Sequence, residues 1–526
     1  MDNSKPVNFL LIITDQQRAD HLGCYGNGIL RTPNIDALAA RGLRADEFHV
    51  ASPICQPNRG SLMTGRMPSV HGVRHNGIDL DLGASTFVDV LRLAGYRTAL
   101  VGKSHLQNIT RNAAHWPPSP ADRLAREARV KTPGEYGQEQ AERWEEDPAH
   151  DMSLPYYGFE QVALSINHAD SQFGHYRRWL RAQRADADAL LGPENALHTP
   201  DYELAKCHQA WRTRCPEELY PTAWVTDQTI SIMRNSVSDG KPFFIQCSYP
   251  DPHHPFTPPG RYWDMYRPED VELPASFHGA HRGAPPHLLA LHAQRDAGKA
   301  VKHTPALFAC SEREAREAIA LNYGNIACID AGVGRLIAAI EQLGIGDNTV
   351  VIFTSDHGEY AGDHQLLLKG PIHYRGVTRV PFIWADPDFA GGKTTPSLLQ
   401  TTDIAPTVLE RAGVAAYNGI QGHSLSGLLV DPSRKVRDTL VIEEEGQRVY
   451  MGFPGRIRMR SLLDGRYRLS LYDGVEWGEL YDLREDPHEL VNLWDEDRGL
   501  RRQLMEAFAY TVFANSDTSP YPDTLA

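Results

Sequence analysis

Short apolar segments alternate with longer helix-like segments along most of this chain, and no other sequence feature restricts its fold as strongly. Residues 9–14, 98–101, 243–247 and 349–354 are compact apolar runs bounded by polar or turn residues. Strands of a parallel sheet are buried on both faces, so they appear in a sequence as continuous apolar runs separated by helices. The alternation therefore predicts an α/β fold built around a largely parallel sheet.

Capping residues locate the helices between these strands. Thr32 and Pro33 are typical of a helix start, and Gly42 is typical of a helix end. Residues 85–94 repeat this pattern, and a long helical stretch at 314–343 precedes the fourth apolar run. Because glycine weakens a helix, we expect the long stretch to break at its glycines.

The length of 526 residues exceeds what one hydrophobic core usually supports, so we expect more than one domain. We assign residues 1–431 to a catalytic domain and residues 432–526 to a C-terminal subdomain with a tail. Within the first domain, residues 107–220 lose the alternating pattern, and we interpret them as an insertion over the sheet. Such an insertion either shapes a pocket or subunit contact, or is a solvated excursion.

The C-terminal part has a different pattern of its own. Strand-like runs separated by turns precede one helical segment, at residues 439–443, 457–462, 467–471 and 498–508. This order predicts a small antiparallel sheet with one helix. The polar tail from residue 515 onward either frays or docks on a neighbouring subunit, which leaves a homo-oligomer open.

Charge and cysteine content narrow the partners and the compartment. The net charge of −14 argues against general binding to nucleic acid or to anionic membranes. The apolar stretch at 9–13 is too short for a signal peptide, and we find no apolar run of transmembrane length. Seven cysteines without a CxxC pair favour reduced thiols over a disulfide framework. We therefore expect a cytoplasmic protein.

Reactive side chains follow each of the four predicted strands. The strand ends carry Asp15-Gln16, Gly102-Lys103-Ser104-His105, Asp251-Pro252-His253-His254 and Ser355-Asp356-His357-Gly358. In open α/β sheets, ligands bind beyond the carboxyl ends of the strands. Carboxylates, an amide, imidazoles and an ammonium gathered at one edge predict a metal-assisted active site.

Asp15, Gln16, Asp356 and His357 form a plausible cage for one divalent cation. Two carboxylates neutralise the charge of the ion and the amide adds a carbonyl oxygen, a donor set that favours Ca²⁺, Mg²⁺ or Mn²⁺. The imidazole shifts the preference somewhat toward Mn²⁺ or Zn²⁺. The alternative is that Asp15 caps a helix or turn and that Asp356 and His357 are ordinary loop residues.

A cysteine lies at a second predicted helix start. Pro57 fits the first turn of this helix and Gly65 fits its end, which places Cys55 at the N-terminus. Backbone N–H groups and the helix dipole favour an anion there, and Arg59 lies one turn further on the same face. The alternative is a buried structural cysteine, which is the commonest role of this residue.

The segment Cys55-x-Pro57-x-Arg59, followed by Thr64-Gly65-Arg66, resembles the signature of the sulfatases, in which a maturation enzyme oxidises the cysteine to formylglycine. Further matching blocks are Thr14-Asp15-Gln16-Gln17-Arg18, Gly23-Cys24-Tyr25-Gly26, Thr32-Pro33-Asn34, His71-Gly72, Gly102-Lys103-Ser104-His105, Pro252-His253-His254-Pro255-Phe256, Asp356-His357-Gly358 and Lys369-Gly370. The resemblance implies the alkaline phosphatase superfamily fold, with a mostly parallel central sheet flanked by helices and a small C-terminal subdomain. It also implies an arylsulfatase-like enzyme that hydrolyses small sulfate monoesters.

The same resemblance implies the ligands of the metal and the contacts of the substrate. One divalent ion, Ca²⁺ or Mn²⁺, would be bound by Asp15, Gln16, Asp356 and His357, and the formylglycine made from Cys55 would complete its shell. Substrate contacts carry over to Asn76, Lys103, His253 and Lys369. In its hydrated form formylglycine is a geminal diol, and metal coordination would make one hydroxyl a nucleophile at neutral pH.

Catalytic roles carry over in the same way. Arg59 and Lys103 would steady the diol and the ester oxygens, where negative charge accumulates. His253 and Lys369 would contact the sulfate, and one of the two would protonate or stabilise the leaving oxygen. His105 would then remove the proton of the second diol hydroxyl, which expels sulfate and restores the aldehyde.

Two departures from the usual sulfatase pattern open an alternative. Gln16 occupies a position where many sulfatases have Asp, and His357 a position where many have Asn; Arg375 replaces a frequent Glu. The Asp-Gln and Asp-His pairs also resemble the phosphonate monoester hydrolases, so a phosphonate monoesterase or phosphodiesterase is a second hypothesis. A third is a binding protein in which Cys55 remains a thiol.

Overall fold

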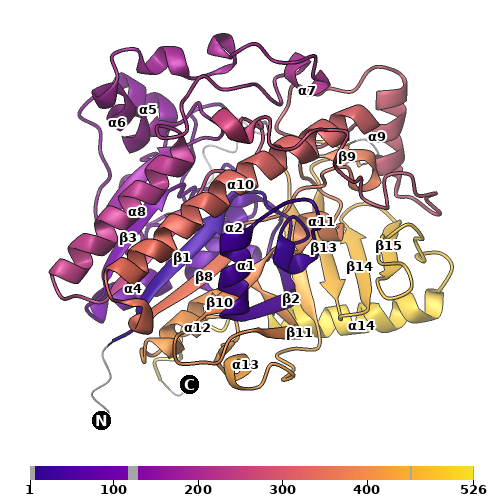
Figure 1. The fold of residues 1–526 in the computed structure, drawn as a ribbon. Coiled ribbons are helices and arrows are strands. Elements are labelled where there is room, and N and C mark those ends of the chain that lie inside the picture. Colours follow the sequence, from indigo (N-terminus) through magenta and orange to yellow (C-terminus); the bar gives the residue numbers. More distant parts are fainter. Residues whose placement is uncertain (1–5, 116–127, 451–452, 525–526) are drawn as a thin grey trace.

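A mixed sheet of nine strands forms the centre of the protein in the computed structural model (Figure 1), which describes residues 6–115, 128–450 and 453–524. In spatial order the strands are β11 (Lys393–Gln400), β2 (Leu43–His49), β10 (Phe382–Ala385), β8 (Thr349–Ser355), β1 (Asn8–Thr14), β6 (Phe243–Ser248), β3 (Arg97–Gly102), β4 (Gln161–Ile166) and β5 (Phe173–Gly174). Only β10 and β5 run antiparallel to the strands beside them. The predicted α/β fold with a mostly parallel sheet is confirmed.

The four strands predicted from the sequence are the adjacent strands β8, β1, β6 and β3. They lie in the middle of the sheet, where every residue of β8, β1 and β6 is buried. The sequence analysis does not predict β2, β10 and β11 on one side or β4 and β5 on the other. Strand β2 contains four charged or imidazole side chains and is only partly buried, so it lacks the continuous apolar run.

Residues 107–220 are only in part an insertion over the sheet. Strand β4 pairs with β3 in parallel and β5 adds one more short strand, so this segment also builds one edge of the central sheet. Helix α6 (His175–Gln183) directly follows β5. The other described residues of the segment form short helices and loops above this edge (Figure 1).

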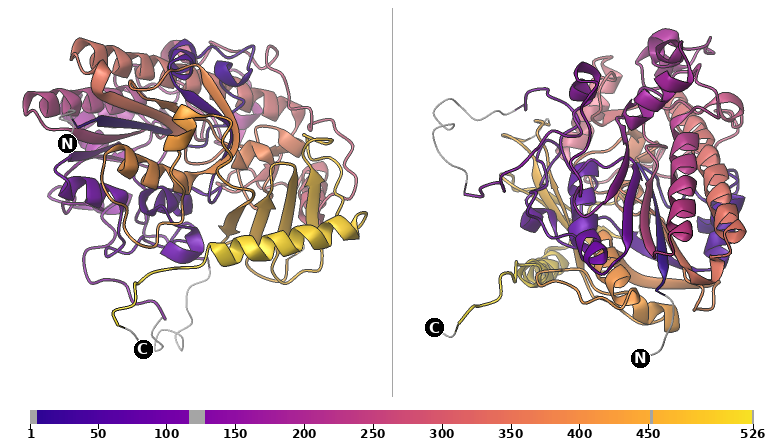
Figure 2. Two further views of the ribbon diagram at one scale, coloured as in Figure 1. Left: turned by 90° about the horizontal axis from the view of Figure 1, so that it is seen from below. Right: turned by 90° about the vertical axis from the view of Figure 1, so that its left-hand side faces the viewer.

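Helices cover both faces of the sheet (Figures 1 and 2). On one face α1 (Pro33–Ala40), α8 (Pro221–Ser238) and α10 (Glu312–Gln342) pack on Leu10 and Ile12 of β1. On the other face α2 (Cys55–Thr64), α4 (Phe87–Leu93) and α12 (Ile404–Arg411) pack on Leu11 and Ile13. Successive side chains of a strand point to opposite faces, so each strand supplies both hydrophobic layers.

The expected breaks in the long helix are absent, because α10 runs without interruption from Glu312 to Gln342. Its glycines provide room for neighbouring segments instead of ending the helix. A Cβ at Gly324 would lie 2.4 Å from the backbone oxygen of Tyr262, and one at Gly332 would lie 2.8 Å from the hydroxyl of Thr226. Among the described helices, α10 alone is long and apolar enough to span a membrane. Of the apolar 18-residue segment that meets this criterion, 67% is buried inside the protein.

The C-terminal part forms the predicted antiparallel sheet and helix. Its strands, in order, are β12 (Leu440–Glu445), β13 (Arg458–Leu463), β14 (Tyr467–Tyr472) and β15 (Gly478–Asp482), and α14 (Arg498–Ala514) lies along one face (Figure 2). The remaining α-helices of the described residues are α3 (Pro68–His71), α5 (Ala141–Glu146), α7 (Glu203–Lys206), α9 (Pro286–Asp296), α11 (Arg375–Thr378) and α13 (Ser426–Val430). Tail residue Asp517 pairs with Arg66 of the same chain.

A buried arginine joins the small sheet to the segment that follows the central site. Arg468 of β14 is 1% exposed and donates to Glu489 at 2.5 Å and to Glu479 at 3.1 Å. The second oxygen of Glu489 accepts the N–H of Arg375, the first residue of α11, at 2.9 Å. Because both carboxylates are buried, the guanidinium is needed to balance their charge.

We expect the substitution Arg468→Met to lower the free energy of unfolding by about 3–5 kcal/mol, because it leaves two carboxylates buried without a cation. The matched control is Arg466→Met, since the ion pair of Arg466 with Asp482 is largely exposed on the arginine side. The control should change the free energy of unfolding by less than about 1 kcal/mol. Urea denaturation of both variants measures the difference, and equal effects would contradict this account.

Candidate active site

The ends of the four middle strands meet at one edge of the sheet, and backbone hydrogen bonds fix them there. The N–H of Asp356 donates to the carbonyl of Thr14 at 3.0 Å, and the N–H of Lys103 donates to the carbonyl of Ser248 at 3.0 Å. Gly102 permits this approach, because its φ is 95° and a Cβ would lie 1.9 Å from the Ser248 oxygen. The predicted convergence of strand ends is therefore present.

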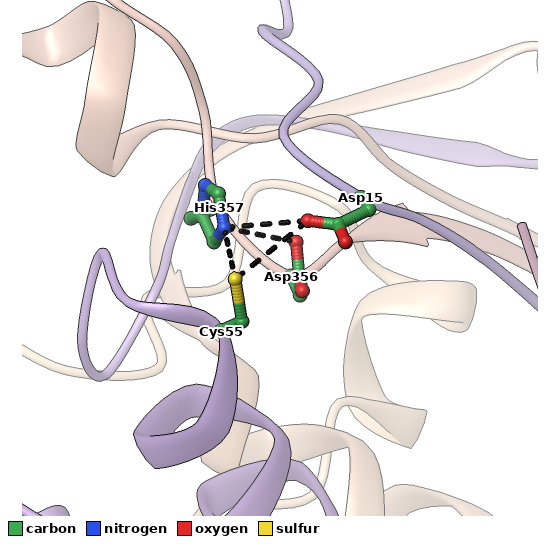
Figure 3. A group of neighbouring side chains, drawn as sticks. All are labelled: Asp15, Cys55, Asp356 and His357. Atoms are coloured by element: carbon green, nitrogen blue, oxygen red, sulfur yellow. Dashed lines mark hydrogen bonds and ion pairs between the residues drawn. The ribbon is translucent and has the colours of Figure 1, made fainter. Parts of the chain in front are cut away.

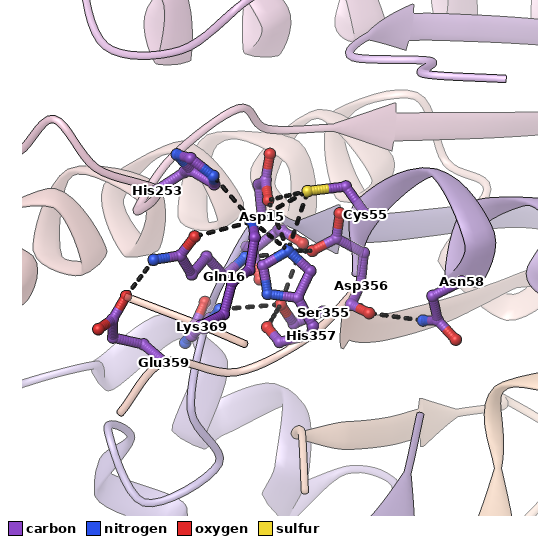
Figure 4. A network of polar contacts seen from close by, with 12 residues as sticks. Asp15, Gln16, Cys55, Asn58, His253, Ser355, Asp356, His357, Glu359 and Lys369 are labelled. Atoms are coloured by element: carbon purple, nitrogen blue, oxygen red, sulfur yellow. Dashed lines mark hydrogen bonds and ion pairs between the residues drawn. The ribbon is translucent and has the colours of Figure 1, made fainter. Parts of the chain in front are cut away.

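Cys55 is the first residue of α2, and the helix ends at Gly65 with a φ of 62°, both as the sequence predicts. The Sγ atom lies 3.0 Å from Nε2 of His357, 3.0 Å from Nζ of Lys369 and 3.8 Å from Oδ1 of Asp15 (Figures 3 and 4). The side chain is 2% exposed. A purely structural cysteine would pack among apolar side chains, whereas this sulfur faces charged groups.

The surroundings of Cys55 favour a negative charge at this position. Burial raises the pKa of the thiol, but the ammonium groups of Lys103 and Lys369 outweigh burial and hold this pKa well below its ordinary value. The N-terminus of α2 acts in the same direction, since its free N–H groups carry partial positive charge. A nucleophile at position 55 is therefore stabilised in its anionic form.

Asp15 and Asp356 each use their two oxygens differently. The Oδ2 atom of Asp15 forms an ion pair with Lys103, and the Oδ2 atom of Asp356 pairs with Nε of Arg59 at 2.8 Å. The Oδ1 atoms face inward, at 3.4 Å and 3.5 Å from Nε2 of His357 (Figure 3). Each carboxylate is thus held by a cation on its outer side and keeps an oxygen for the centre.

These groups fit a divalent cation. Ligand atoms of Asp15, Cys55, Asp356 and His357 all lie within 4.8 Å of one another and all four side chains are buried. Each of the two carboxylates keeps one inward oxygen, and oxygen donors of this kind suit Ca²⁺, Mg²⁺ or Mn²⁺. The structure brings together three of the four predicted protein ligands and residue 55. Their binding of an ion stays a prediction.

Gln16, the remaining predicted ligand, lies beside the same centre (Figure 4). Its Oε1 atom accepts from Lys369 at 3.0 Å, and its amide nitrogen donates to Glu359. The Nζ atom of Lys369 also lies 2.9 Å from His253 and 2.9 Å from His357. An ammonium has three donors, so it cannot bond these groups and the Cys55 sulfur simultaneously. Lys369 is therefore a shared cation at the middle of the site.

The two histidines with predicted catalytic roles occupy different parts of the site. His253 contacts Lys369 directly and is 4% exposed. His105 is also buried, and its Nδ1 atom has no hydrogen-bond partner among the described residues. Its backbone N–H donates to Glu139 at 2.6 Å, and its φ of 59° is unusual for a residue with a side chain. A buried imidazole nitrogen without a partner remains available for a proton.

Arg59 and Asn76 support the helix of Cys55 in ways that the sequence analysis did not specify. Besides Asp356, Arg59 donates to the carbonyl of Lys103 and to the hydroxyl of Ser248, and its Nη2 has no partner among the described residues. The side-chain oxygen of Asn76 accepts the N–H of Gln56 at 3.1 Å, in the first turn of α2. Direct contact of Arg59 and Asn76 with substrate stays a prediction.

Two further residues of the site escaped the sequence analysis. Glu359 follows the His357 segment and accepts from Gln16 (Figure 4). His168 follows β4, and its Nε2 lies 2.7 Å from Nζ of Lys103. The signal for His168 is the same as for the other strand ends, since residues 161–166 form a strand of the central sheet. It was missed because that strand was not predicted.

A buried acidic cluster beside a cysteine of lowered pKa, at the carboxyl ends of a mixed α/β sheet, is an arrangement that suits a metal-assisted hydrolase. A family model described as Sulfatase matches residues 7–414, and one described as N-sulphoglucosamine sulphohydrolase, C-terminal, matches residues 362–509. The first match spans most of the chain. The protein therefore belongs to the sulfatase family, the enzymes that hydrolyse sulfuric esters, and the family inferred from the sequence is confirmed.

Relatives and solved structures of this family align over nearly the whole chain. The arylsulfatase of Clostridium perfringens (strain 13 / Type A) is 27% identical, covering 92% of this chain and 90% of the relative. The multifunctional alkaline phosphatase superfamily protein PehA of Trinickia caryophylli is 28% identical, covering 92% and 91%. The crystal structure of the phosphonate monoester hydrolase of Agrobacterium radiobacter has a TM-score of 0.75 at 24% identity, covering 98% and 96%. This last similarity establishes the fold.

One buried carboxyl near the site should make stability depend on pH. Burial raises the pKa of Asp251 from 3.8 to about 7, although hydrogen bonds from Thr222 and Tyr220 oppose the shift. The folded state therefore binds the proton more tightly than the unfolded state, and its stability falls as pH rises from about 4 through about 7. A shift of about three pKa units corresponds to a few kcal/mol.

We expect Asp251→Asn to remove this pH dependence while keeping the size of the side chain. Urea denaturation of both proteins at about pH 4 and about pH 8 gives the free energy of unfolding in each condition. The free energy of unfolding of the variant, relative to that of the wild type, should be a few kcal/mol more favourable at the higher pH than at the lower pH. The contributions of other titrating groups cancel when the variant is compared with the wild type at each pH. If the two proteins differ in free energy of unfolding by the same amount at both pH values, the raised pKa of Asp251 is contradicted.

Proposed function

We propose that this protein hydrolyses sulfate monoesters through a formylglycine made from Cys55. The observation that carries the proposal is the placement of Cys55 at the start of α2, with its sulfur beside Asp15, His357 and Lys369. Membership of the sulfatase family supports both the modification and the ester class. The Clostridium perfringens relative is named arylsulfatase, which favours an aryl leaving group.

The cations of the site suit a tetrahedral anion with several oxygens. Lys103 and Lys369 both act electrostatically on residue 55, so an ester bound next to that residue would lie near two ammonium groups. The free Nη2 of Arg59 is one more donor available to the ester or to the hydrated aldehyde. These donors are fixed by buried partners, so they stabilise negative charge that develops on the sulfate oxygens without reorganising.

Two histidines would transfer protons in this mechanism. His253, in contact with Lys369, would protonate or stabilise the leaving oxygen. His105, with an unpartnered ring nitrogen, would accept the proton of the second hydroxyl of the hydrated aldehyde as sulfate departs. A divalent ion bound by Asp15, Gln16, Asp356 and His357 would supply the positive charge that activates a hydroxyl at residue 55.

Conversion of Cys55 is tested by peptide mass spectrometry of protein produced together with a formylglycine-generating maturation enzyme. The peptide that contains residue 55 should have the lower mass of the aldehyde. We expect Cys55→Ala to reduce hydrolysis of an aryl sulfate by at least about a thousandfold, because the nucleophile is lost. A circular dichroism melt checks that the variant is folded. An unmodified thiol in fully active protein would contradict the proposal.

A phosphonate monoester hydrolase is the second candidate, and the residues at positions 16 and 357 favour it. Gln16 lies beside the centre and His357 faces the sulfur, where the pattern of the sequence resembles that group of enzymes. PehA, a relative named for multifunctional activity in the superfamily, aligns over almost the whole chain. Comparing kcat/KM for an aryl sulfate and for an aryl phosphonate monoester separates the candidates. We expect the sulfate to be preferred, and a strong preference for the phosphonate would reverse our choice.

Removal of the metal should abolish hydrolysis. The inward oxygens of Asp15 and Asp356 need a cation between them, so protein treated with a chelator should lose activity by at least about a hundredfold. Restoring Ca²⁺, Mn²⁺ or Mg²⁺ separately shows which ion the site uses, and we expect Ca²⁺ or Mn²⁺ to be most effective. Unchanged activity in protein that elemental analysis shows to be free of metal would contradict a metal-assisted mechanism.

A further inference from the structure

His168 lies in the loop that follows β4, at the same sheet edge as the other site residues. Its side chain is 15% exposed, compared with 2% for Lys103 and 0% for Asp15. Its ring stacks on His253, with centroids 3.6 Å apart and an angle of 11° between the planes. The imidazole is therefore held in a fixed orientation on the more accessible side of Lys103.

The loop that presents His168 has an unusual backbone and firm anchors. The residues on either side, Asn167 and Ala169, have φ values of 83° and 57°. Non-glycine residues adopt this region rarely and at a cost, so surrounding contacts must hold them there. Buried Asp170 supplies these contacts by accepting from the hydroxyl of Thr213 at 2.5 Å and from the indole N–H of Trp211 at 3.1 Å.

The contact between Lys103 and His168 has only one chemical assignment. An ammonium group donates and cannot accept, so Nε2 of His168 must be the acceptor of the 2.7 Å hydrogen bond. Lys103 also donates to Oδ2 of Asp15. Two of its three donors are thus directed to fixed partners on the protein. Among the described residues, no other hydrogen bond of this ammonium is present.

We propose that His168 is a positioning residue, which holds the Lys103 ammonium so that its third N–H points to an oxygen of the bound ester. One partner restrains an ammonium only in part, because the nitrogen can still shift about that hydrogen bond, whereas two partners at fixed places define where the third donor points. The ring of His253 fixes the ring plane of His168 and the Asp170 anchors fix its backbone. This inference rests on the proposed function, because that function places the ester beside Lys103.

Two substitutions separate the hydrogen bond from the stacking. His168→Phe keeps a flat ring against His253 but has no acceptor for Lys103. His168→Gln loses the ring but places an amide oxygen near the position of Nε2. If orientation of Lys103 matters, the Phe variant should lose about ten- to a hundredfold in kcat/KM for an aryl sulfate, in the range of a hydrogen bond to a charged group. The Gln variant should stay within about threefold of the wild type.

Affinity for inorganic sulfate gives a second readout that does not require turnover. Calorimetric titration of sulfate into metal-loaded protein should show weaker binding for His168→Phe and nearly normal binding for His168→Gln. The control is His278→Phe, which removes an exposed imidazole 3.6 Å from Glu312 on the protein surface, outside the site. The wild type and the variants are compared at equal aldehyde and metal content. Their melting temperatures should be equal, which shows that the variants are folded.

The outcomes distinguish this inference from the proposed function. Equal activity and equal sulfate affinity of the Phe variant and the wild type would overturn the role of His168, and so would a Gln variant as impaired as the Phe variant. Neither result would count against sulfate ester hydrolysis, provided that the wild type is active. The wild type could instead hydrolyse no sulfate ester, while His168→Phe still binds sulfate more weakly than the wild type and His168→Gln binds it nearly normally. In that case the proposed function fails and the positioning of Lys103 stands.

Discussion

Two carboxylates buried side by side impose the main constraint on this molecule. Asp15 and Asp356 are both fully buried and lie next to the same imidazole. Unpaired charges in such a place would be prohibitively unfavourable, so each carboxylate needs a cation. Lys103 and Arg59 occupy the outer oxygens and leave the inner oxygens facing a common centre. The arrangement that balances this charge therefore leaves two inner oxygens free to face a divalent ion, the ligand role that we propose for them.

The rest of the fold serves to keep this balance fixed. Parallel strands bring Asp15, Lys103 and Asp356 to one edge, and α2 directs its N-terminus and Cys55 at the same point. The loop after Lys369 continues into α11. Glu489 of the C-terminal part accepts the first N–H of this helix and so helps to hold the segment of Lys369 in place. The small sheet is thus connected to the active site through the buried Arg468 network, although its own strands carry none of the predicted ligands.

The sequence allowed prediction of those parts whose physical signal is local. Strands β8, β1, β6 and β3 are almost entirely buried and therefore mostly apolar, and the Pro57 and Gly65 signals located α2 correctly. Strand β4 is only half buried and lies in a region without the alternating pattern, so the place of His168 at its end was missed. The glycines of α10 were interpreted as breaks because the neighbours that need the space, such as Tyr262, come from elsewhere in the chain. The pairing of Arg59 with Asp356 is likewise a tertiary contact without a sequence signal.

The most direct test is a crystal structure of matured, metal-loaded protein with anomalous diffraction at wavelengths that identify the ion. The account predicts one anomalous peak between the inner oxygens of Asp15 and Asp356, with His357 and an oxygen of the modified residue 55 as further ligands and with Lys103 and Arg59 on the outer oxygens. Density for an unmodified sulfur at residue 55 in active protein, together with no peak among these side chains, would contradict it.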